Sequence, residues 1–160
     1  MRYFINVNFN ILVYGVGSKR NFINNFILTH FSHEPCLIVN GFHSGANMKA
    51  ITNPMIKFIN KTFPVEGKCS NSIHDQIEFI KRTFETYKPN QYDFQKYFIV
   101  IHSMDIGTLK NDEWQKYLSE LASVDAIQMI VSVDNIKAGI MWSEQMLDRF
   151  NFLGFEVNTF

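Results

Sequence analysis

The apolar residues of this chain fall into two patterns, short continuous runs and longer stretches with helical spacing. The short runs predict strands over residues 10–14, 36–39, 97–101, 127–133 and 152–157. Because apolar and polar residues do not alternate regularly within them, these runs are typical of strands buried on both faces of a parallel sheet.

Stretches with helical spacing lie between these runs. We expect helices from a Ser18 N-cap up to Pro35, and over residues 47–63, 73–87, 112–124 and 143–150. In the first of them, Phe22 and Phe26 beside Ile23 and Ile27 recur every four residues, as on one helical face. Pro54 should kink or split the second helix. Alternating strands and helices predict a three-layer α/β fold around a parallel five-stranded sheet.

Length and composition indicate one intracellular domain. A chain of 160 residues can bury about 70% of the surface that its unfolded form exposes. It contains 46% hydrophobic residues and sixteen Phe, which excludes a disordered segment. No apolar run approaches the ~18 residues of a membrane span, and the N-terminus lacks a signal-peptide pattern. From the lack of such a span we expect no membrane. Two cysteines cannot make a disulfide framework, so we expect a reducing compartment.

The charges are unevenly distributed although their sum is zero. Residues 1–70 hold seven of the fifteen Lys and Arg but two of the fifteen Asp and Glu, hence +5 against −5 for the remainder. Such a division suits an anionic partner, and it equally suits lateral docking of unlike subunits.

A glycine loop follows the first strand, at the place where α/β proteins hold phosphate. It comprises Gly15, Val16, Gly17, Ser18, Lys19 and Arg20. As a dinucleotide-binding motif it fails at Arg20, where a third glycine is needed. As a nucleotide phosphate loop it is too short before Lys19, and Arg20 replaces the hydroxyl that binds Mg²⁺. The residues therefore predict a tight turn without a ligand.

The acid pair that accompanies a phosphate loop is also missing. Active sites of this kind end the third strand with carboxylates for Mg²⁺ and for water activation. Here His102 and Ser103 stand at those positions, and Asp105 comes too late. His102, Ser103 and Asp105 include catalytic-triad residue types, but neighbours on an extended chain point in different directions. We expect an inert site with neither catalysis nor a cofactor.

Two pairs of residues could be drawn as a zinc site. They are His33 with Cys36, and Cys69 with His74. Because Cys36 heads an apolar strand, a buried structural cysteine is the favoured interpretation. We expect no metal site.

The loop block from Tyr14 to Arg20 closely resembles that of the subunit-two family of the eukaryotic origin recognition complex. Further matches follow in the family's order, at 39–42, 101–102 with Asp105, 121–123, 132–134, 141–142 and 151–153. They extend from about Phe9 to Phe160.

This resemblance implies an AAA+/RecA-like domain of the phosphate-loop type with a degenerate nucleotide site. Asn135 would hold the place of the phosphate-sensing Asn of active relatives. We expect residues 1–160 to be this single core domain, without the helical lid and winged-helix domain that follow in the family. Members are non-catalytic architectural subunits of a nuclear, hetero-oligomeric ring. That ring binds origin DNA and, with ATPase neighbours, loads the replicative helicase.

One alternative function stays open, a divergent phosphate-loop enzyme such as an NTPase or a transferase. Arg20 and the His102–Ser103 pair argue against it, because they replace the groups that would bind Mg²⁺ and activate water.

The family also implies a DNA-facing helical element after the second strand, here residues 41–63. The candidate DNA contacts in it are Ser44, Gly45, Lys49, Lys57 and Lys61. Lys57 and Lys61 are four residues apart and share one helical face, while Met55 and Ile59 belong to the apolar side. A solvated basic face is the alternative interpretation.

Overall fold

Five parallel strands form one sheet in the computed structural model, which describes residues 1–159. The strands are β1 (Asn10–Tyr14), β2 (Cys36–Asn40), β3 (Tyr97–His102), β4 (Ile127–Ser132) and β5 (Phe152–Glu156). The α-helices are α1 (Arg2–Asn6), α2 (Arg20–His30), α3 (Met48–Thr62), α4 (Ile73–Glu85), α5 (Asp112–Ala122) and α6 (Glu144–Phe150). Short 3₁₀ turns form η1 (Pro89–Gln91), η2 (Gly107–Lys110) and η3 (Ala138–Met141). The predicted strands are confirmed.

The strand order is β2-β3-β4-β1-β5, and every neighbouring pair is parallel. Ile11 of β1 faces Ile130 of β4 on one side and Leu153 of β5 on the other. Because all strands run the same way, their carboxyl ends meet at one edge of the sheet. Loops that follow the strands are therefore brought together there, which is where open α/β sheets form their sites.

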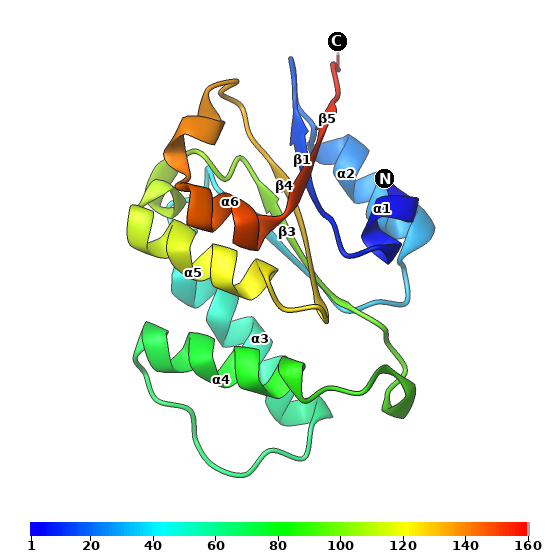
Figure 1. Cartoon of the computed structure of the whole chain (residues 1–160), viewed down its shortest axis with the longest axis vertical. Helices are drawn as coiled ribbons and strands as arrows, with labels where there is room; N and C mark the ends of the chain where they lie inside the picture. Colours follow the sequence, from blue (N-terminus) through cyan, green and yellow to red (C-terminus); the bar gives the residue numbers. More distant parts are fainter. Residues whose placement is uncertain (160) are drawn as a thin grey trace.

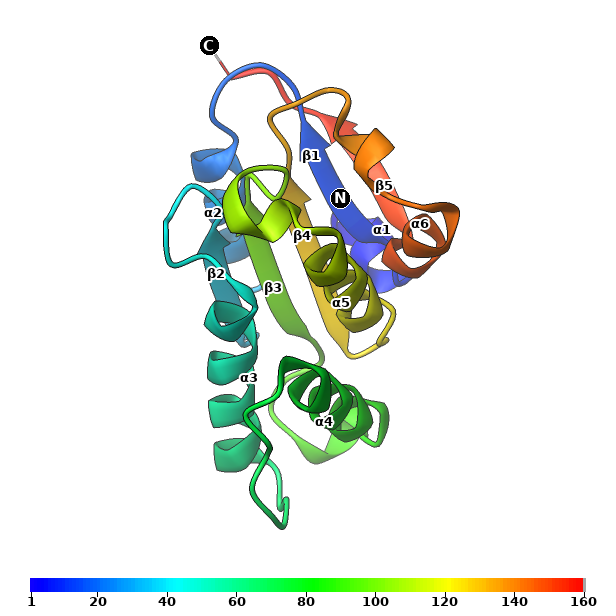
Figure 2. The same cartoon turned by 90° about the vertical axis from the view of Figure 1, so that its left-hand side faces the viewer.

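Helices cover both faces of the sheet, as predicted (Figures 1 and 2). Helices α1 and α2 lie on one face, where Ile5, Ile23 and Ile27 pack against Ile11 and Phe98. Helices α3, α4, α5 and α6 lie on the other face and enclose the larger apolar cluster. No helix within residues 1–159 combines the length and the apolar character that a membrane span requires.

The edge strands are less buried than predicted, because all strands were expected to be buried on both faces. Strands β3 and β4 are buried at every position, but Cys36 and Ile38 of β2 are exposed. The expectation of a buried structural Cys36 is therefore wrong. The cause is the place of β2 at the edge of the sheet, which an apolar run alone does not reveal.

Two helix predictions also need correction. Helix α2 begins at Arg20 with Lys19 as its N-cap, and no side chain caps it, so Ser18 is not the cap. On this helix Ile23 and Ile27 are buried, whereas Phe22 is 38% exposed and does not belong to the buried face.

Helix α3 continues through Pro54 and is not split. Pro54 is exposed, while Ile51, Met55 and Ile59 form a fully buried stripe on a neighbouring face of the helix. Packing of that apolar stripe holds the helix together across the missing backbone N–H. Helix α1, by contrast, was not expected from the sequence pattern.

Candidate functional site

The loop between β1 and α2 lies at the carboxyl edge of the sheet, beside the ends of β3 and β4. It borders an open depression of about 620 Å³. The predicted site residues that line it are Gly15, Gly17, Ser18, Lys19, Arg20, His102 and Ser103. The structure thus brings the glycine loop and the end of the third strand together, as the sequence predicted.

Lys19 is directed into its own loop rather than into the depression. Its Nζ donates hydrogen bonds to the carbonyl oxygens of Gly15 (2.9 Å) and Gly17 (2.8 Å). The same atom lies 3.3 Å from Oδ1 of Asp134, and the residue is only 3% exposed. An ammonium has three N–H donors; the two carbonyls use two of them, and the carboxylate of Asp134 balances the positive charge. Lys19 is therefore held within the loop rather than presented to a phosphate group.

The segment after β5 lies on the loop and occupies part of its backbone. The N–H of Val16 donates to Oδ1 of Asn158 over 2.8 Å. In return the N–H of Thr159 donates to the carbonyl of Val16 (2.9 Å), and its hydroxyl donates to the carbonyl of Ser18 (2.8 Å). A loop amide that would otherwise be available to an anion is thus bonded within the chain.

The two loop glycines are required by this contact. Gly15 and Gly17 have φ values of +127° and +87°, which side-chain-bearing residues rarely adopt. A Cβ on Gly17 would lie 2.0 Å from the carbonyl oxygen of Thr159. Glycine at this position therefore allows close approach of the chain's own C-terminal segment.

His102 is a buried, neutral group where active relatives carry a carboxylate. The residue is 3% exposed, and its Nε2 lies within hydrogen-bond distance, 3.1 Å, of Oδ1 of Asn24. Its Nδ1 has no hydrogen-bond partner among the described residues. Burial lowers the pKa of His102, and the positive charge of Arg20 lowers it further. This position therefore supplies no negative charge to the site.

Ser103 and Asp105 have structural partners of their own. The N–H of Ser103 donates to Oγ of Ser132 (3.0 Å). The carboxylate of Asp105 accepts hydrogen bonds from the N–H groups of Asp134 (3.1 Å) and Asn135 (2.8 Å). His102, Ser103 and Asp105 thus face different groups and do not form a triad. Asp105 instead fixes the segment that follows β4.

Asn135 lies outside the loop depression. It lines a neighbouring hollow together with Tyr14, Val16 and Ile106. Its side-chain Oδ1 accepts a hydrogen bond from the N–H of Lys137 over 2.9 Å. The family-implied place of Asn135 next to the phosphate loop therefore stays a prediction.

Three residues that matter here were not expected from the sequence, namely Asn24, Asp134 and Asn158. Asp134 follows the fourth strand almost directly, and carboxyl ends of parallel strands meet at one edge, so its position was a usable signal. Asn24 lies one helical turn after Arg20, on the same side of α2. The contact of Asn158 with the loop has no local signal, because 142 residues separate its two partners.

The five candidate DNA contacts are all exposed. Ser44 and Gly45 lie in the loop after β2, and the N–H of Gly45 donates to Nδ1 of His43 (3.3 Å). Lys57 and Lys61 share one face of α3, but Lys49 lies about 80° around the helix from Lys57. The lysines therefore form a broad surface rather than one narrow row.

The cysteine and histidine pairs do not converge. Within residues 1–159 no group of three His, Cys, Asp or Glu side chains is close enough together to hold a metal ion.

Comparison with known proteins decides the family. A model described as "Origin recognition complex subunit 2 RecA-like domain" matches residues 2–157. The chain belongs to this family. Subunit 2 of Homo sapiens is 28% identical over 159 residues, which covers 98% of this chain and 26% of the human protein. Subunit 2 of Saccharomyces cerevisiae is 24% identical over 173 residues, or 95% of this chain and 28% of the yeast protein. This subunit-2 RecA-like domain thus spans about a quarter of the length of these curated relatives.

Solved structures confirm the RecA-like fold. The Drosophila origin recognition complex bound to AT-rich DNA and Cdc6 contains a chain with a TM-score of 0.87 and 26% identity. The match covers 99% of this subunit-2 domain and 51% of that chain. The Aeropyrum pernix ORC1 protein in complex with DNA has a TM-score of 0.64 at 12% identity, covering 92% and 39%, and shows the same fold.

Proposed function

We propose that this domain is a non-catalytic architectural part of an origin recognition complex, which helps to bind origin DNA and to load the replicative helicase. The observation that carries the proposal is the inward position of Lys19. Its Nζ is held by the carbonyls of Gly15 and Gly17 and by Asp134. A loop whose cation is bound internally attracts a triphosphate weakly. The role proposed for the domain is therefore to make contacts with the other subunits and with origin DNA.

The proposed partners are the other subunits of the complex, origin DNA and, indirectly, the replicative helicase. Support comes from the relatives, which are named as subunit 2 in animals, yeast and plants. It also comes from two Drosophila complexes, one bound to DNA and Cdc6 and the other bound to DNA. A nucleus is the proposed location, because eukaryotic replication origins lie there.

The absence of nucleotide chemistry can be tested by calorimetric titration with Mg-ATP. We expect no measurable binding to the chain, since Lys19 is occupied and His102 replaces a carboxylate. An active phosphate-loop ATPase in the same buffer is the positive control. A dissociation constant in the micromolar range would favour the alternative function, a divergent phosphate-loop NTPase or transferase.

The proposed DNA surface is the solvent side of α3 with the loop before it. Helix α3 contains Lys49, Lys57 and Lys61 and no acidic residue. Within residues 1–159 these lysines make no ion pair. Ser44 and Gly45 add a small exposed loop next to the helix. Unpaired lysines on one surface are suited to the sequence-independent phosphate contacts that position a protein on a duplex.

The DNA proposal is tested in a complex reconstituted with the full-length protein. Substitution of Lys57→Ala with Lys61→Ala should reduce the slope of log affinity against log salt by about two. Affinity should fall equally for all sequences, because phosphate contacts do not read bases. Lys110→Ala with Lys116→Ala removes two exposed lysines elsewhere and is the matched control. An unchanged slope in the Lys57/Lys61 variant would show that these side chains are only solvated.

A further inference from the structure

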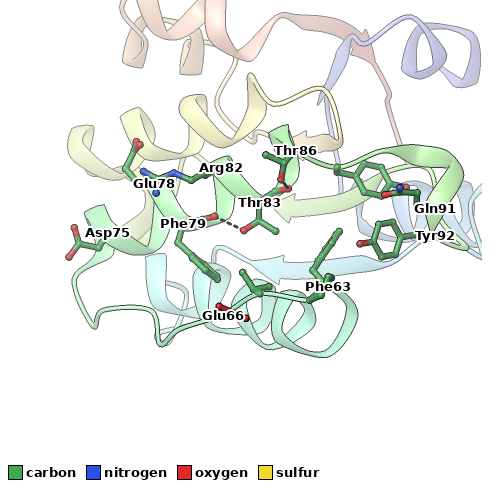
Figure 3. A pocket seen from close by; sticks show the side chains of 13 residues that line it. Phe63, Glu66, Asp75, Glu78, Phe79, Arg82, Thr83, Thr86, Gln91 and Tyr92 are labelled. Atoms are coloured by element: carbon green, nitrogen blue, oxygen red, sulfur yellow. Dashed lines mark hydrogen bonds between the residues drawn. The ribbon is translucent and has the colours of Figure 1, made fainter.

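A half-open groove lies between α4, the loop that precedes it, and η1. Its volume is about 600 Å³, and Figure 3 shows the side chains that line it. In Figures 1 and 2 helix α4 lies at the opposite end of the molecule from the β1–α2 loop. The groove is therefore separate from the degenerate phosphate-loop site and from the proposed role of that site.

One stripe of α4 forms a long wall of the groove. Asp75, Phe79, Thr83 and Thr86 line it and follow each other at intervals of three or four residues, as on one helical face. From Asp75 to Thr86 this stripe extends for about 16 Å along the helix axis. That length matches about five residues of extended peptide.

One end of the groove is aromatic and fixed by contacts within the protein. Figure 3 shows Tyr92 and Gln91 at the end away from Asp75. The rings of Phe63 and Tyr92 are 4.8 Å apart, and Tyr87 stacks on Phe94 at 5.0 Å. The hydroxyl of Tyr87 also donates to the carbonyl of Phe94. An apolar side chain of a ligand would meet a surface that is already ordered, so little entropy is lost there.

The other end of the groove is acidic. Asp75 and Glu78 line it, Glu66 lies between the two ends in Figure 3, and Arg82 is the single cation among the described lining residues. Glu78 shares Lys81 as an ion-pair partner with Glu120, at 3.3 Å and 3.6 Å. Three carboxylates and one guanidinium leave the lining with a net charge of −2, which disfavours a nucleic-acid backbone and favours Lys or Arg side chains. Charge thus selects a basic segment as the occupant.

We propose that this groove docks an extended segment of a partner protein in which Lys or Arg stands within about five residues of an aromatic or aliphatic side chain. The cation would lie by Asp75 and Glu78, and the apolar side chain would lie on Phe63 and Tyr92. A groove of about 600 Å³ offers a contact much smaller than a standard protein–protein interface, so the isolated contact should be weak.

The test uses fluorescein-labelled peptides and fluorescence polarisation. The panel places one Phe at successive distances from a Lys-Arg pair, in both orders. Matched peptides replace Lys-Arg by Glu-Glu or Phe by Ala. We expect one spacing to bind best and to lose affinity by about tenfold when Lys-Arg becomes Glu-Glu, which creates like-charge repulsion, or when Phe becomes Ala. Equal binding of the acidic or Ala peptides would overturn the proposal.

Two variants localise the binding. Asp75→Lys with Glu78→Lys should weaken the best peptide by at least about tenfold, because attraction becomes repulsion. Glu85→Lys with Asp93→Lys makes the same change in net charge at exposed sites that do not line the groove. It should leave peptide affinity within about twofold. Circular dichroism establishes that each variant is folded.

Thr83→Trp tests the apolar contact without changing charge, since an indole at this position would fill the middle of the groove. It should abolish binding of the best peptide. Normal affinity of this variant, or equal losses in the two charge-reversal variants, would place the peptide elsewhere and overturn the proposal. So would a loss of duplex-DNA binding specific to Thr83→Trp, which changes no charge, because the groove would then be a nucleic-acid surface. Failure of the Lys57 and Lys61 test leaves this outcome unaffected.

Discussion

At the scale of single residues, the ammonium group of Lys19 binds groups of its own chain at the position where a phosphate-loop lysine binds phosphate. Its side chain, 2% exposed, joins two loop carbonyls to the carboxylate of Asp134. The residue type is that of a phosphate loop, but the contacts are those of a buried structural lysine. The sequence could reveal the defect at Arg20, whereas the direction of the Lys19 side chain depends on the tertiary position of Asp134.

Replacement of Lys19 should therefore destabilise the fold. Lys19→Met keeps most of the side-chain volume but leaves the carbonyls of Gly15 and Gly17 without their donor. We expect the free energy of unfolding to fall by about 1–3 kcal/mol. Urea denaturation measures the change, and Lys49→Met on the exposed side of α3 is the control. Equal stability of the Lys19→Met variant and the unmodified chain would show that the contacts of Nζ contribute little.

His102 should make stability depend on pH. Burial keeps its folded-state pKa below the ordinary value of 6.5. Well above pH 6.5 both states are neutral at this residue and its burial carries no protonation cost. Below it the unfolded chain takes up a proton that the folded chain resists, so the free energy of unfolding falls until the folded-state pKa is passed.

His102→Gln isolates this contribution, because a Gln side chain keeps an N–H donor for Asn24 and does not titrate. Between about pH 7 and about pH 5 the unmodified chain should lose more stability than this variant. Urea denaturation at each pH gives the difference. His33→Gln removes an exposed histidine and should follow the unmodified chain. Parallel curves for all three proteins would contradict the assigned neutral, buried state of His102.

At the scale of elements, apolar pattern located the strands and most helices but not their exposure. A continuous apolar run such as 36–39 resembles a central strand, yet β2 pairs only with β3. Whether a strand is central or at an edge is decided by the order of strands, which periodicity does not encode. Helix α1 escaped prediction because its five residues are too short for a clear period.

Helix α3 offers a test of how packing overrides local preference. Pro54 removes a backbone N–H from the helix interior, a cost that the buried stripe of Ile51, Met55 and Ile59 offsets. Pro54→Ala should restore that hydrogen bond and raise the free energy of unfolding by about 1–2 kcal/mol. Thermal and urea denaturation measure the gain, with Asn53→Ala as the control. A loss of stability would indicate that the proline fits this turn of the helix without cost.

At the scale of the whole molecule, the three-layer fold could be predicted because strand and helix patterns alternate cleanly. The loop and the end of β3 could be placed together for the same reason, since parallel strands present their carboxyl ends at one edge. Neither argument predicts the contact of Asn158 with the loop or the groove beside α4. These two features depend on contacts between segments far apart in the sequence, which a local pattern does not predict.

The uneven distribution of charge follows the architecture. The positive part, residues 1–70, contains α2, the edge strand β2 and the lysine-bearing helix α3. The negative part contains α4, α5 and α6, including the acidic end of the groove. The two parts of opposite net charge therefore also form different helices. This division agrees with the proposals that place DNA contacts on α3 and a basic peptide in the groove beside α4.

The sheet order has a consequence for synthesis on the ribosome. Strand β1 lies between β4 and β5, so the first strand to be made obtains both neighbours last. Its pairs with β5 join residues such as Asn10 and Phe152, and pairings so distant in sequence form slowly. Until β5 emerges, a nascent chain exposes one edge of β1, a surface that recruits other strands. Emergence of β5 from the ribosome therefore ends the period in which this domain depends most on chaperones.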